Sequence, residues 1–190
     1  MPKRSTLFIQ NGIYHIYNRG NNRQLIFFER ENYLHFLRLV RQYLLTRNIE
    51  VLAYCLMPNH YHLLVRLRET DLSEGMKRLS LAYTKAINKR FERVGSLFQG
   101  RFQTIHVAEQ AYLVHLVKYI HCNPVKAGLV HSVRDWEFSS YQEYAGLRNG
   151  SLPNINVVKS QLTSVDEYRS FLEDKSLLAS PKIRSLMLDE

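Results

Sequence analysis

The apolar residues of the chain are spaced with two different periods. Short runs rich in β-branched and aromatic residues are typical of strands, and such runs occupy residues 13–17, 49–57, 60–67 and 102–107. Apolar residues three and four positions apart are typical of amphipathic helices, and they occupy residues 30–46, 71–94 and 113–123. The pattern therefore predicts strand, helix, strand, strand, helix, strand, and then a further helix.

This order of elements is the split βαβ pattern of ferredoxin-like sheets. The expected fold class is α+β: a ferredoxin-like or RRM-like βαββαβ antiparallel sheet with helices, followed by one more helix and a C-terminal extension. That helix should end near Asn123, because Pro124 disfavours helical geometry in the residue before it. We expect residues 1–149 to form one domain and residues 150–190 a partly helical extension, with a short amphipathic helix around residues 165–172.

An excess of basic residues in the main body adds a candidate partner. Residues 1–149 contain 21 Lys and Arg against 11 Asp and Glu, whereas residues 150–190 contain 5 against 6. Such a positive field favours a polyanion, with nucleic acid first, although a soluble basic protein without such a partner has the same composition.

Neither a membrane segment nor a secretory signal is expected. No apolar run approaches the roughly 18 residues that span a bilayer, and the N-terminal stretch has basic residues without a long apolar core. The 2 cysteines, Cys55 and Cys122, form no spaced metal motif and no disulfide framework. These features predict a protein of the reducing cytoplasm.

Two histidines share one face of the third predicted strand. Side chains alternate along a strand, so His60 and His62 project to one side and Tyr61 to the other. Two neighbouring imidazoles can hold one metal ion or flank one phosphate. They can equally be strand-end histidines that hydrogen-bond to the backbone.

The last long helix carries a second polar pair. Tyr119 and Asn123 are four residues apart, so they share one helical face and offer a hydroxyl and a carboxamide together. The alternative is that Tyr119 only packs and Asn123 only ends the helix. His121 points about 200° around the helix from the tyrosine, which indicates a structural role.

Taken together, these segments resemble a known family. The sequences "PNHYHLLV" and "YIHCNPVKAGLV" are similar to the two signature segments of the single-tyrosine HUH transposases, in which HUH denotes histidine, bulky hydrophobe, histidine, here His60-Tyr61-His62. The segments "YHIYNRGNNRQLIF", "GSLFQGRF" and "WEFSSYQEY" resemble the REP-associated tyrosine transposases (RAYT) in particular. The resemblance extends from about residue 14 to residue 144.

The resemblance implies a nicking and joining activity on DNA. It makes Tyr119 the nucleophile and His60, His62 and Asn123 the ligands of one divalent metal ion, Mg²⁺ or Mn²⁺. The implied product is a 5′-phosphotyrosine with a free 3′-hydroxyl, and the implied substrate is a single-stranded DNA hairpin formed by a repetitive palindrome. Two imidazoles alone would favour zinc, copper or nickel, whereas an amide oxygen, phosphate and water supply the harder ligands that Mg²⁺ prefers.

Elementary chemistry agrees with this set of residues. A metal ion on a non-bridging oxygen polarises phosphorus and offsets the negative charge that repels an attacking oxyanion. A phenol, with an ordinary pKa near 10, needs nearby positive charge or a base to lose its proton. A covalent phosphotyrosine conserves the bond energy, so the hydroxyl of a second strand can attack it and rejoin DNA.

Basic and amide side chains are the expected DNA contacts. One group lies on and after the second helix: Lys85, Lys89, Arg90, Arg93 and Arg101. The other lies in the loop "NRGNNRQ": Arg19, Asn21, Asn22 and Arg23. Fork-like groups on a loop suit base edges and phosphates, although a row of basic residues on a helix is as often only its solvated face.

Three other functions fit parts of the pattern. A non-catalytic RRM-like module would bind single-stranded nucleic acid on the same sheet, but it leaves the joint presence of the histidines, tyrosine and asparagine unexplained. A two-histidine phosphoesterase needs a second equivalent motif. A GIY-type nuclease, suggested by Gly12-Ile13-Tyr14, needs its second motif much closer than Tyr119.

The oligomeric state is open between a monomer and a homodimer. Shorter relatives in the wider family work as dimers that exchange the tyrosine helix, whereas the REP-associated kind can act as monomers. We favour a monomer, because residues 150–190 could occupy the surface that a partner would need.

Overall fold

The computed structural model describes residues 8–109, 112–161, 168 and 170. Its centre is a four-stranded sheet with the strand order β2-β3-β1-β4, in which every neighbouring pair is antiparallel. The strands are β1 (Ile13–Arg19), β2 (Ile49–Met57), β3 (His60–Leu67) and β4 (Gln103–His106). Met57 pairs with His60, so the connection between β2 and β3 is a tight turn. The predicted α+β fold with a ferredoxin-like sheet is confirmed.

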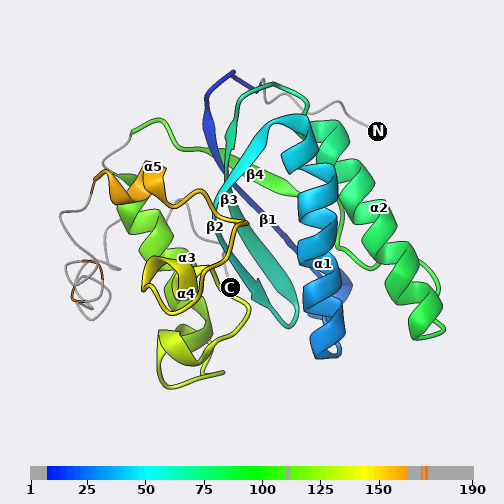
Figure 1. Cartoon of the computed structure of the whole chain (residues 1–190). Helices are drawn as coiled ribbons and strands as arrows, with labels where there is room; N and C mark the ends of the chain where they lie inside the picture. The colour runs from blue at the N-terminus through cyan, green and yellow to red at the C-terminus, as the bar shows by residue number, and fades with distance from the viewer. Residues whose placement is uncertain (1–7, 110–111, 162–167, 169, 171–190) are drawn as a thin grey trace.

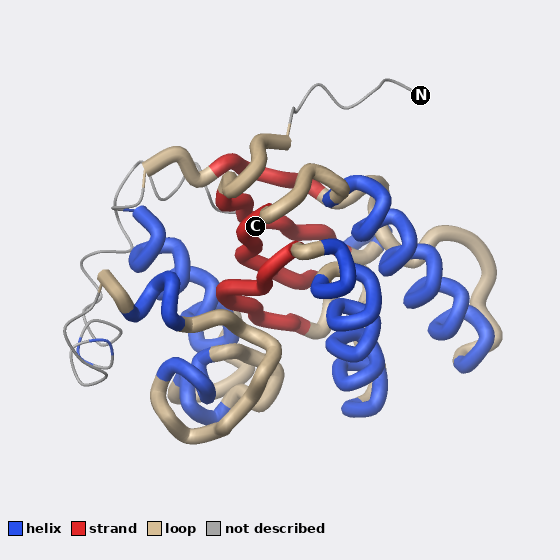
Figure 2. Tube along the Cα trace, turned by 45° about the horizontal axis from the view of Figure 1, so that its top comes forward, coloured by secondary structure: helices blue, strands red, loops and turns tan. Residues whose placement is uncertain are grey.

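Helices cover both faces of this sheet (Figure 1). On one face lie α1 (Arg30–Tyr43) and α2 (Leu72–Arg90). On the other lie α3 (Leu113–Lys126), α4 (Tyr141–Tyr144) and α5 (Asn156–Lys159). Short 3-10 turns η1 (Asn21–Arg23), η2 (Leu45–Arg47) and η4 (Val133–Asp135) complete the described elements. Figure 2 shows the strands as a layer between the two groups of helices.

Alternation along β3 divides the core into two clusters. Tyr61, Leu63 and Val65 belong to a cluster under α1 and α2, whereas Leu64 belongs to a smaller cluster under α3, α4 and α5. Even-numbered residues of β3 therefore face α3. His60 and His62 share this parity, so the predicted common face of the two histidines is confirmed and it is the face that α3 covers.

The end of α3 differs from the prediction, which placed it near Asn123. The helix continues through Pro124 to Lys126. It ends because Gly128 adopts φ +67°, a left-handed conformation, and donates its N–H to the Val125 carbonyl oxygen at 3.0 Å. Proline near the end of a helix loses only one backbone donor, and here the glycine is the stronger stop.

Two other helix boundaries were also predicted wrongly. The helix α1 ends at Tyr43 rather than at residue 46, because the chain turns through η2 into Asn48 with φ +52°. The helix α2 ends at Arg90, four residues early, shortly before Glu92 with φ +50°. Asp71 accepts no capping hydrogen bond and instead pairs with Arg47 at 3.1 Å.

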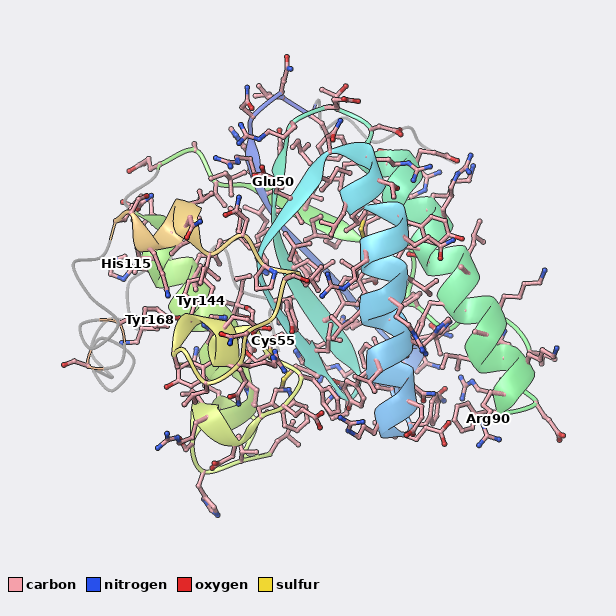
Figure 3. All side chains as sticks on the ribbon, viewed as in Figure 1. Glu50, Cys55, Arg90, His115, Tyr144 and Tyr168 are labelled. Carbon is pink, nitrogen blue, oxygen red and sulfur yellow. The ribbon has the colours of Figure 1, made fainter. Side chains whose placement is uncertain are left out.

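The described residues beyond position 149 pack onto the main body. Leu152 is buried in the cluster under α1 and α2, and Val158 and Tyr168 are buried in the cluster under α3. Figure 3 shows Tyr144 and Tyr168 close together beside α3. The helix predicted around residues 165–172 lies outside the described residues apart from Tyr168 and Ser170. The separation of residues 150–190 as a functional extension stays a prediction.

His121 points away from the face of Tyr119, as predicted from its angle on the helix. Its Nε2 lies 2.7 Å from Ser140 Oγ and its Nδ1 lies 2.5 Å from the Tyr168 hydroxyl. Burial lowers the pKa of His121 to about 3, so the ring stays neutral in the folded protein. The residue therefore joins α3 to α4 and to Tyr168.

The pKa of His121 makes stability depend on pH. Below its ordinary pKa of 6.5 the unfolded chain binds a proton that the folded chain refuses until about pH 3, so the free energy of unfolding falls as pH falls across this window. One such group contributes about 1.4 kcal/mol per pH unit. Urea unfolding between pH 6 and pH 4 should show that the free energy of unfolding of His121→Gln falls less steeply with pH than that of wild type, by about 1.4 kcal/mol per pH unit. Exposed His131→Gln is the control, and equal slopes for His121→Gln and wild type would contradict the assignment.

Candidate active site

Strands β1 and β3 position the histidines. His60 begins β3 directly after the turn and pairs with Arg19, and His62 pairs with Tyr17. Both histidines face α3, whose apolar residues pack on β2 and β3. The short turn and the central position of β3 fix the two rings on a rigid part of the sheet, with ring centroids 5.0 Å apart.

His60 has one ring nitrogen engaged. Its Nδ1 lies 2.7 Å from Asn59 Oδ1, and because an amide oxygen only accepts, Nδ1 carries the proton. The lone pair is then on Nε2. Burial, and to a smaller extent the charge of Arg19, lowers the pKa of His60 to about 4. The ring is therefore neutral near pH 7, the form that binds metals.

His62 is fully buried and its Nδ1 lies 2.9 Å from His15 Nε2. Its pKa is well below the ordinary value, first because of burial and then because of His15, His60 and Lys126. Its Nε2 is buried and has no hydrogen-bond partner among the described residues. A neutral imidazole with an unused buried nitrogen is suited to binding a metal ion.

Tyr119 lies over His62 and His15. Its ring meets the ring of His62 edge to face at 5.6 Å and that of His15 at 6.3 Å. The side chain is only 2% exposed. Lys126, two turns further along α3, places its Nζ 4.7 Å from the centroid of the tyrosine ring. The phenol therefore lies between the neutral imidazole of His62 and the ammonium of Lys126.

Asn123 lies one turn after Tyr119 on the same face of α3. Its Nδ2 donates to the Tyr119 carbonyl oxygen at 2.8 Å, which fixes the orientation of the amide. Its Oδ1 is buried and has no hydrogen-bond partner in the described part of the chain. An oriented amide oxygen of this kind is a hard ligand suited to Mg²⁺ or Mn²⁺.

These atoms fit the metal that the sequence resemblance implies. Two buried acceptors, His62 Nε2 and Asn123 Oδ1, have no hydrogen-bond partner within the described ranges, and His60 keeps a lone pair on Nε2. No group of three or more His, Cys, Asp or Glu side chains that could hold a metal ion occurs among residues 8–109, 112–161, 168 and 170. A site formed by these residues would need the amide oxygen of Asn123 as its third protein ligand.

Part of the predicted DNA-binding set lies beside the histidines. Arg19 and Arg101 line a cavity of about 440 Å³, together with Tyr17, Asn18, Gln99, Gly100 and Gln103. Arg19 Nε donates to Gln99 Oε1. Asn21, Asn22 and Arg23 form the exposed turn η1. The Arg23 carbonyl oxygen accepts from Asn59 Nδ2 at 3.3 Å, so this loop adjoins the turn before His60.

The remaining basic residues lie on α2 or just after it. Lys85, Lys89 and Arg90 are on α2, which covers the face opposite to α3, and Arg93 follows this helix. Figure 3 shows Arg90 at the end of α2, far from His115 on α3. Arg90 pairs with Glu29 at 3.3 Å, and Arg93 donates to Gln24 at 3.3 Å. The three residues of α2 therefore lie across the sheet from the histidines, whereas Arg93 lies beside Gln24 at the end of η1. DNA contact by these four residues stays a prediction.

Sequence reasoning missed two residues that the structure brings to the site. His15 touches His62 across neighbouring strands, and Lys126 lies over Tyr119. Lys126 is seven residues after Tyr119, so helical periodicity would have found it if α3 had been extended past Pro124. His15 could have been noticed as a histidine that alternates with apolar Tyr14 and Ile16 on the first strand.

Comparison with known proteins bears on this arrangement. The chain matches the model of the family described as "Transposase IS200 like" over residues 8–123, which contain both histidines, Tyr119 and Asn123. The chain belongs to the IS200-like transposase family. The described residues contain no helix long and apolar enough to cross a membrane.

The relatives of this transposase are REP-associated. It is 31% identical over 103 residues to a REP-associated tyrosine transposase of Haemophilus influenzae, covering 48% of this chain and 58% of that protein. It is 31% identical over 97 residues to the one of Escherichia coli K12, covering 50% of this chain and 56% of that protein. The chain thus spans less than two thirds of the curated relatives that it matches. The predicted resemblance is confirmed.

A solved structure shares the fold. It is a REP-associated tyrosine transposase bound to a REP hairpin, with a TM-score of 0.65 and 22% sequence identity, covering 81% of this chain and 98% of that one. At this identity the match supports the α+β architecture alone.

Proposed function

We propose that the protein is a transposase that nicks and joins single-stranded hairpin DNA through a covalent tyrosine intermediate. The observation that carries this proposal is the position of Tyr119, which lies edge-on over buried, neutral His62 with the free amide oxygen of Asn123 one turn away. A sheet that only bound nucleic acid would not need a buried phenol against the neutral ring of His62, with the neutral ring of His60 next to it.

In the proposed reaction Tyr119 is the nucleophile. Its phenolic oxygen attacks the phosphorus of a DNA phosphodiester, the phenolic proton is lost, and the bond to the 3′-oxygen breaks. The products are a 5′-phosphotyrosine and a strand that ends in a 3′-hydroxyl, which takes up a proton. Attack by a 3′-hydroxyl on the phosphotyrosine reverses these bond changes and joins DNA.

The surrounding residues have separate tasks in this proposal. His60, His62 and Asn123 would hold one divalent ion, Mg²⁺ or Mn²⁺, which supplies charge neutralisation at the phosphate when bound. Asn59 fixes the ring of His60 with Nε2 available. The Asn123 amide is fixed by the Tyr119 carbonyl oxygen, so ligand and nucleophile keep one spacing on α3.

Lys126 would stabilise the phenolate of Tyr119, since its ammonium is 4.7 Å from the ring centroid. A cation over an aromatic face contributes about 1–2 kcal/mol, so Lys126→Met should slow adduct formation about tenfold and move its onset to higher pH. Rates of SDS-stable adduct formation across a pH series measure this. Lys126→Arg should retain most of the rate, remote Lys159→Met should change nothing, and an unchanged Lys126→Met profile would contradict the role.

The DNA contacts proposed are the residues that surround the histidines. Arg19, Arg101 and the loop of Asn21, Asn22 and Arg23 would hold the backbone and read unpaired bases near the scissile phosphate. Lys85, Lys89, Arg90 and Arg93 would contact the body of a hairpin that extends across the other face. We propose a monomer that acts on hairpins of repetitive palindromes in the cytoplasm.

Metal dependence of adduct formation tests the proposal. Purified protein and end-labelled single-stranded hairpin DNA are mixed with Mg²⁺ or Mn²⁺, or with EDTA, and SDS-resistant adducts are counted. An adduct that forms only with the metal ion supports the tyrosine transesterase. Hairpin binding without any adduct, across several repeat-derived substrates and both metal ions, would support the RRM-like binding module instead.

A further inference from the structure

His15 is a buried polar residue that the proposed reaction does not use. It lies on β1, is fully buried, and stacks its ring on that of His62 at a centroid distance of 5.1 Å. Its Nε2 lies within hydrogen-bond distance of His62 Nδ1, at 2.9 Å. Burying a second imidazole in the sheet carries a desolvation cost, which suggests a task beyond packing.

The hydrogen bond between the two rings has two forms. In one, His62 Nδ1 carries the proton and donates to His15 Nε2, which leaves a lone pair on His62 Nε2. In the other, His15 donates, and a neutral His62 must carry its proton on Nε2. Only the first form leaves Nε2 able to bind a metal ion, because a protonated ring nitrogen has no lone pair to offer.

The sheet supplies few alternative acceptors for His62 Nδ1. Backbone carbonyl oxygens of β3 are engaged in the ladders to β1 and β2 on its two sides. A side chain on the same face of a neighbouring strand must therefore accept. His15 is on β1 diagonally opposite His62, two residues before Tyr17, its direct partner. That position places an acceptor within reach and also limits rotation of the His62 ring.

We propose that His15 is a positioning residue that accepts the Nδ1 proton of His62 and so directs the Nε2 lone pair of His62 into the metal site. This inference rests on the proposed function, because it assigns His62 to the metal. His15 makes no contact with DNA or metal in this proposal and acts only through the tautomer and orientation of His62. Partners of this kind typically change metal affinity 10- to 100-fold.

The first test measures metal binding without DNA. Calorimetric titration with Mn²⁺ compares wild type, His15→Leu and His15→Gln, with His131→Leu at an exposed site as control. Leucine fills the space but accepts no hydrogen bond, so the Mn²⁺ dissociation constant should rise about 10- to 100-fold. Glutamine offers an acceptor oxygen and should restore the constant to within a few-fold of wild type. Equal constants for all variants, or an equal loss in Leu and Gln variants that both remain folded by circular dichroism, would overturn the proposal.

The second test observes the tautomer directly. Two-bond ¹⁵N–¹H correlation spectra of metal-free wild-type protein, with His62 assigned by comparison with His62→Gln, distinguish Nδ1–H from Nε2–H. An Nδ1–H tautomer supports the proposal, and it does so even if His15→Leu fails to fold. An Nε2–H tautomer in a protein that still forms metal-dependent adducts would overturn the role of His15 and leave the proposed function standing. A wild type that neither binds Mn²⁺ nor forms an adduct would overturn the proposed function and this inference together.

Discussion

Tyr119→Phe is expected to abolish the SDS-stable protein–DNA adduct while hairpin binding stays within a few-fold of wild type. The change removes one hydroxyl oxygen and keeps the ring that packs on His62 and His15. Without that oxygen no phosphotyrosine can form, so the loss is complete rather than partial. Denaturing gels measure the adduct, and binding curves on the same hairpin measure the affinity.

Tyr17→Phe is the matched control, because Tyr17 is the other tyrosine near the histidines. Its ring centroid lies 6.4 Å from that of His62, compared with 5.6 Å for Tyr119. This variant should form adducts at a rate close to that of wild type. If the adduct persists in Tyr119→Phe and is lost in Tyr17→Phe, the chemistry is right but the nucleophile is on β1.

His62→Ala is expected to slow adduct formation about 10³-fold and to weaken Mn²⁺ binding strongly. Charge neutralisation by a bound metal ion is worth several kcal/mol of the barrier, and each 1.4 kcal/mol is about tenfold in rate. His62 offers a fully buried nitrogen that has no other partner among the residues described. Adduct rates over a range of Mn²⁺ concentrations, together with calorimetric titration, measure both effects.

For His62→Ala, a fall in activity caused by misfolding has to be distinguished from one caused by loss of the proposed metal-binding nitrogen. His62→Ala leaves a cavity in a packed sheet and should also lower the free energy of unfolding by a few kcal/mol. Its urea-induced unfolding is therefore measured in the absence of metal. His62→Gln keeps more of the volume and should share the loss of Mn²⁺ affinity. Exposed His131→Ala should resemble wild type in all measurements. A folded His62→Gln with wild-type affinity and rate would remove His62 from the metal site.

The sheet was predictable because its signals are local. Alternation along β3 gives the common face of His60 and His62, and the short Pro58-Asn59 connection gives the antiparallel pairing. These properties follow from the period of a strand and from turn geometry, and neither requires knowledge of distant contacts. The fold class followed from the order of the elements along the chain.

The residues missed were hidden for two different reasons. Lys126 is missed because the sequence predicts that the last helix ends near Asn123, which leaves Lys126 outside the helix. The helix in fact ends just before Gly128, so Lys126 lies on the same helical face as Tyr119. His15 was lost because its contact with His62 depends on the register between β1 and β3. Register is set by long-range packing, which no single segment of sequence displays.

The basic residues show a further limit of sequence reasoning. Arg93 and Arg101 are close in sequence and equal in charge, yet Arg101 lines the cavity that Arg19 also lines, whereas Arg93 packs on the ring of Phe28. The charge of a residue alone does not indicate where in the fold its side chain lies. The side of the sheet on which a basic residue lies is decided by the path of the chain between α2 and β4.

The division of the core into two clusters has a consequence for the local stability of the protein. His60 and His62 lie on β3, whose other face packs against the larger cluster under α1 and α2. Tyr119 belongs to the smaller cluster under α3. Less buried apolar surface means that α3 opens more often, and native-state hydrogen exchange should show its amides to be the less protected. A single truncation such as Leu116→Ala would increase that opening and leave the sheet in place. In the proposed function the nucleophile depends on α3 and the first DNA contacts on the sheet and its loops, so such a truncation should reduce adduct formation more than hairpin binding.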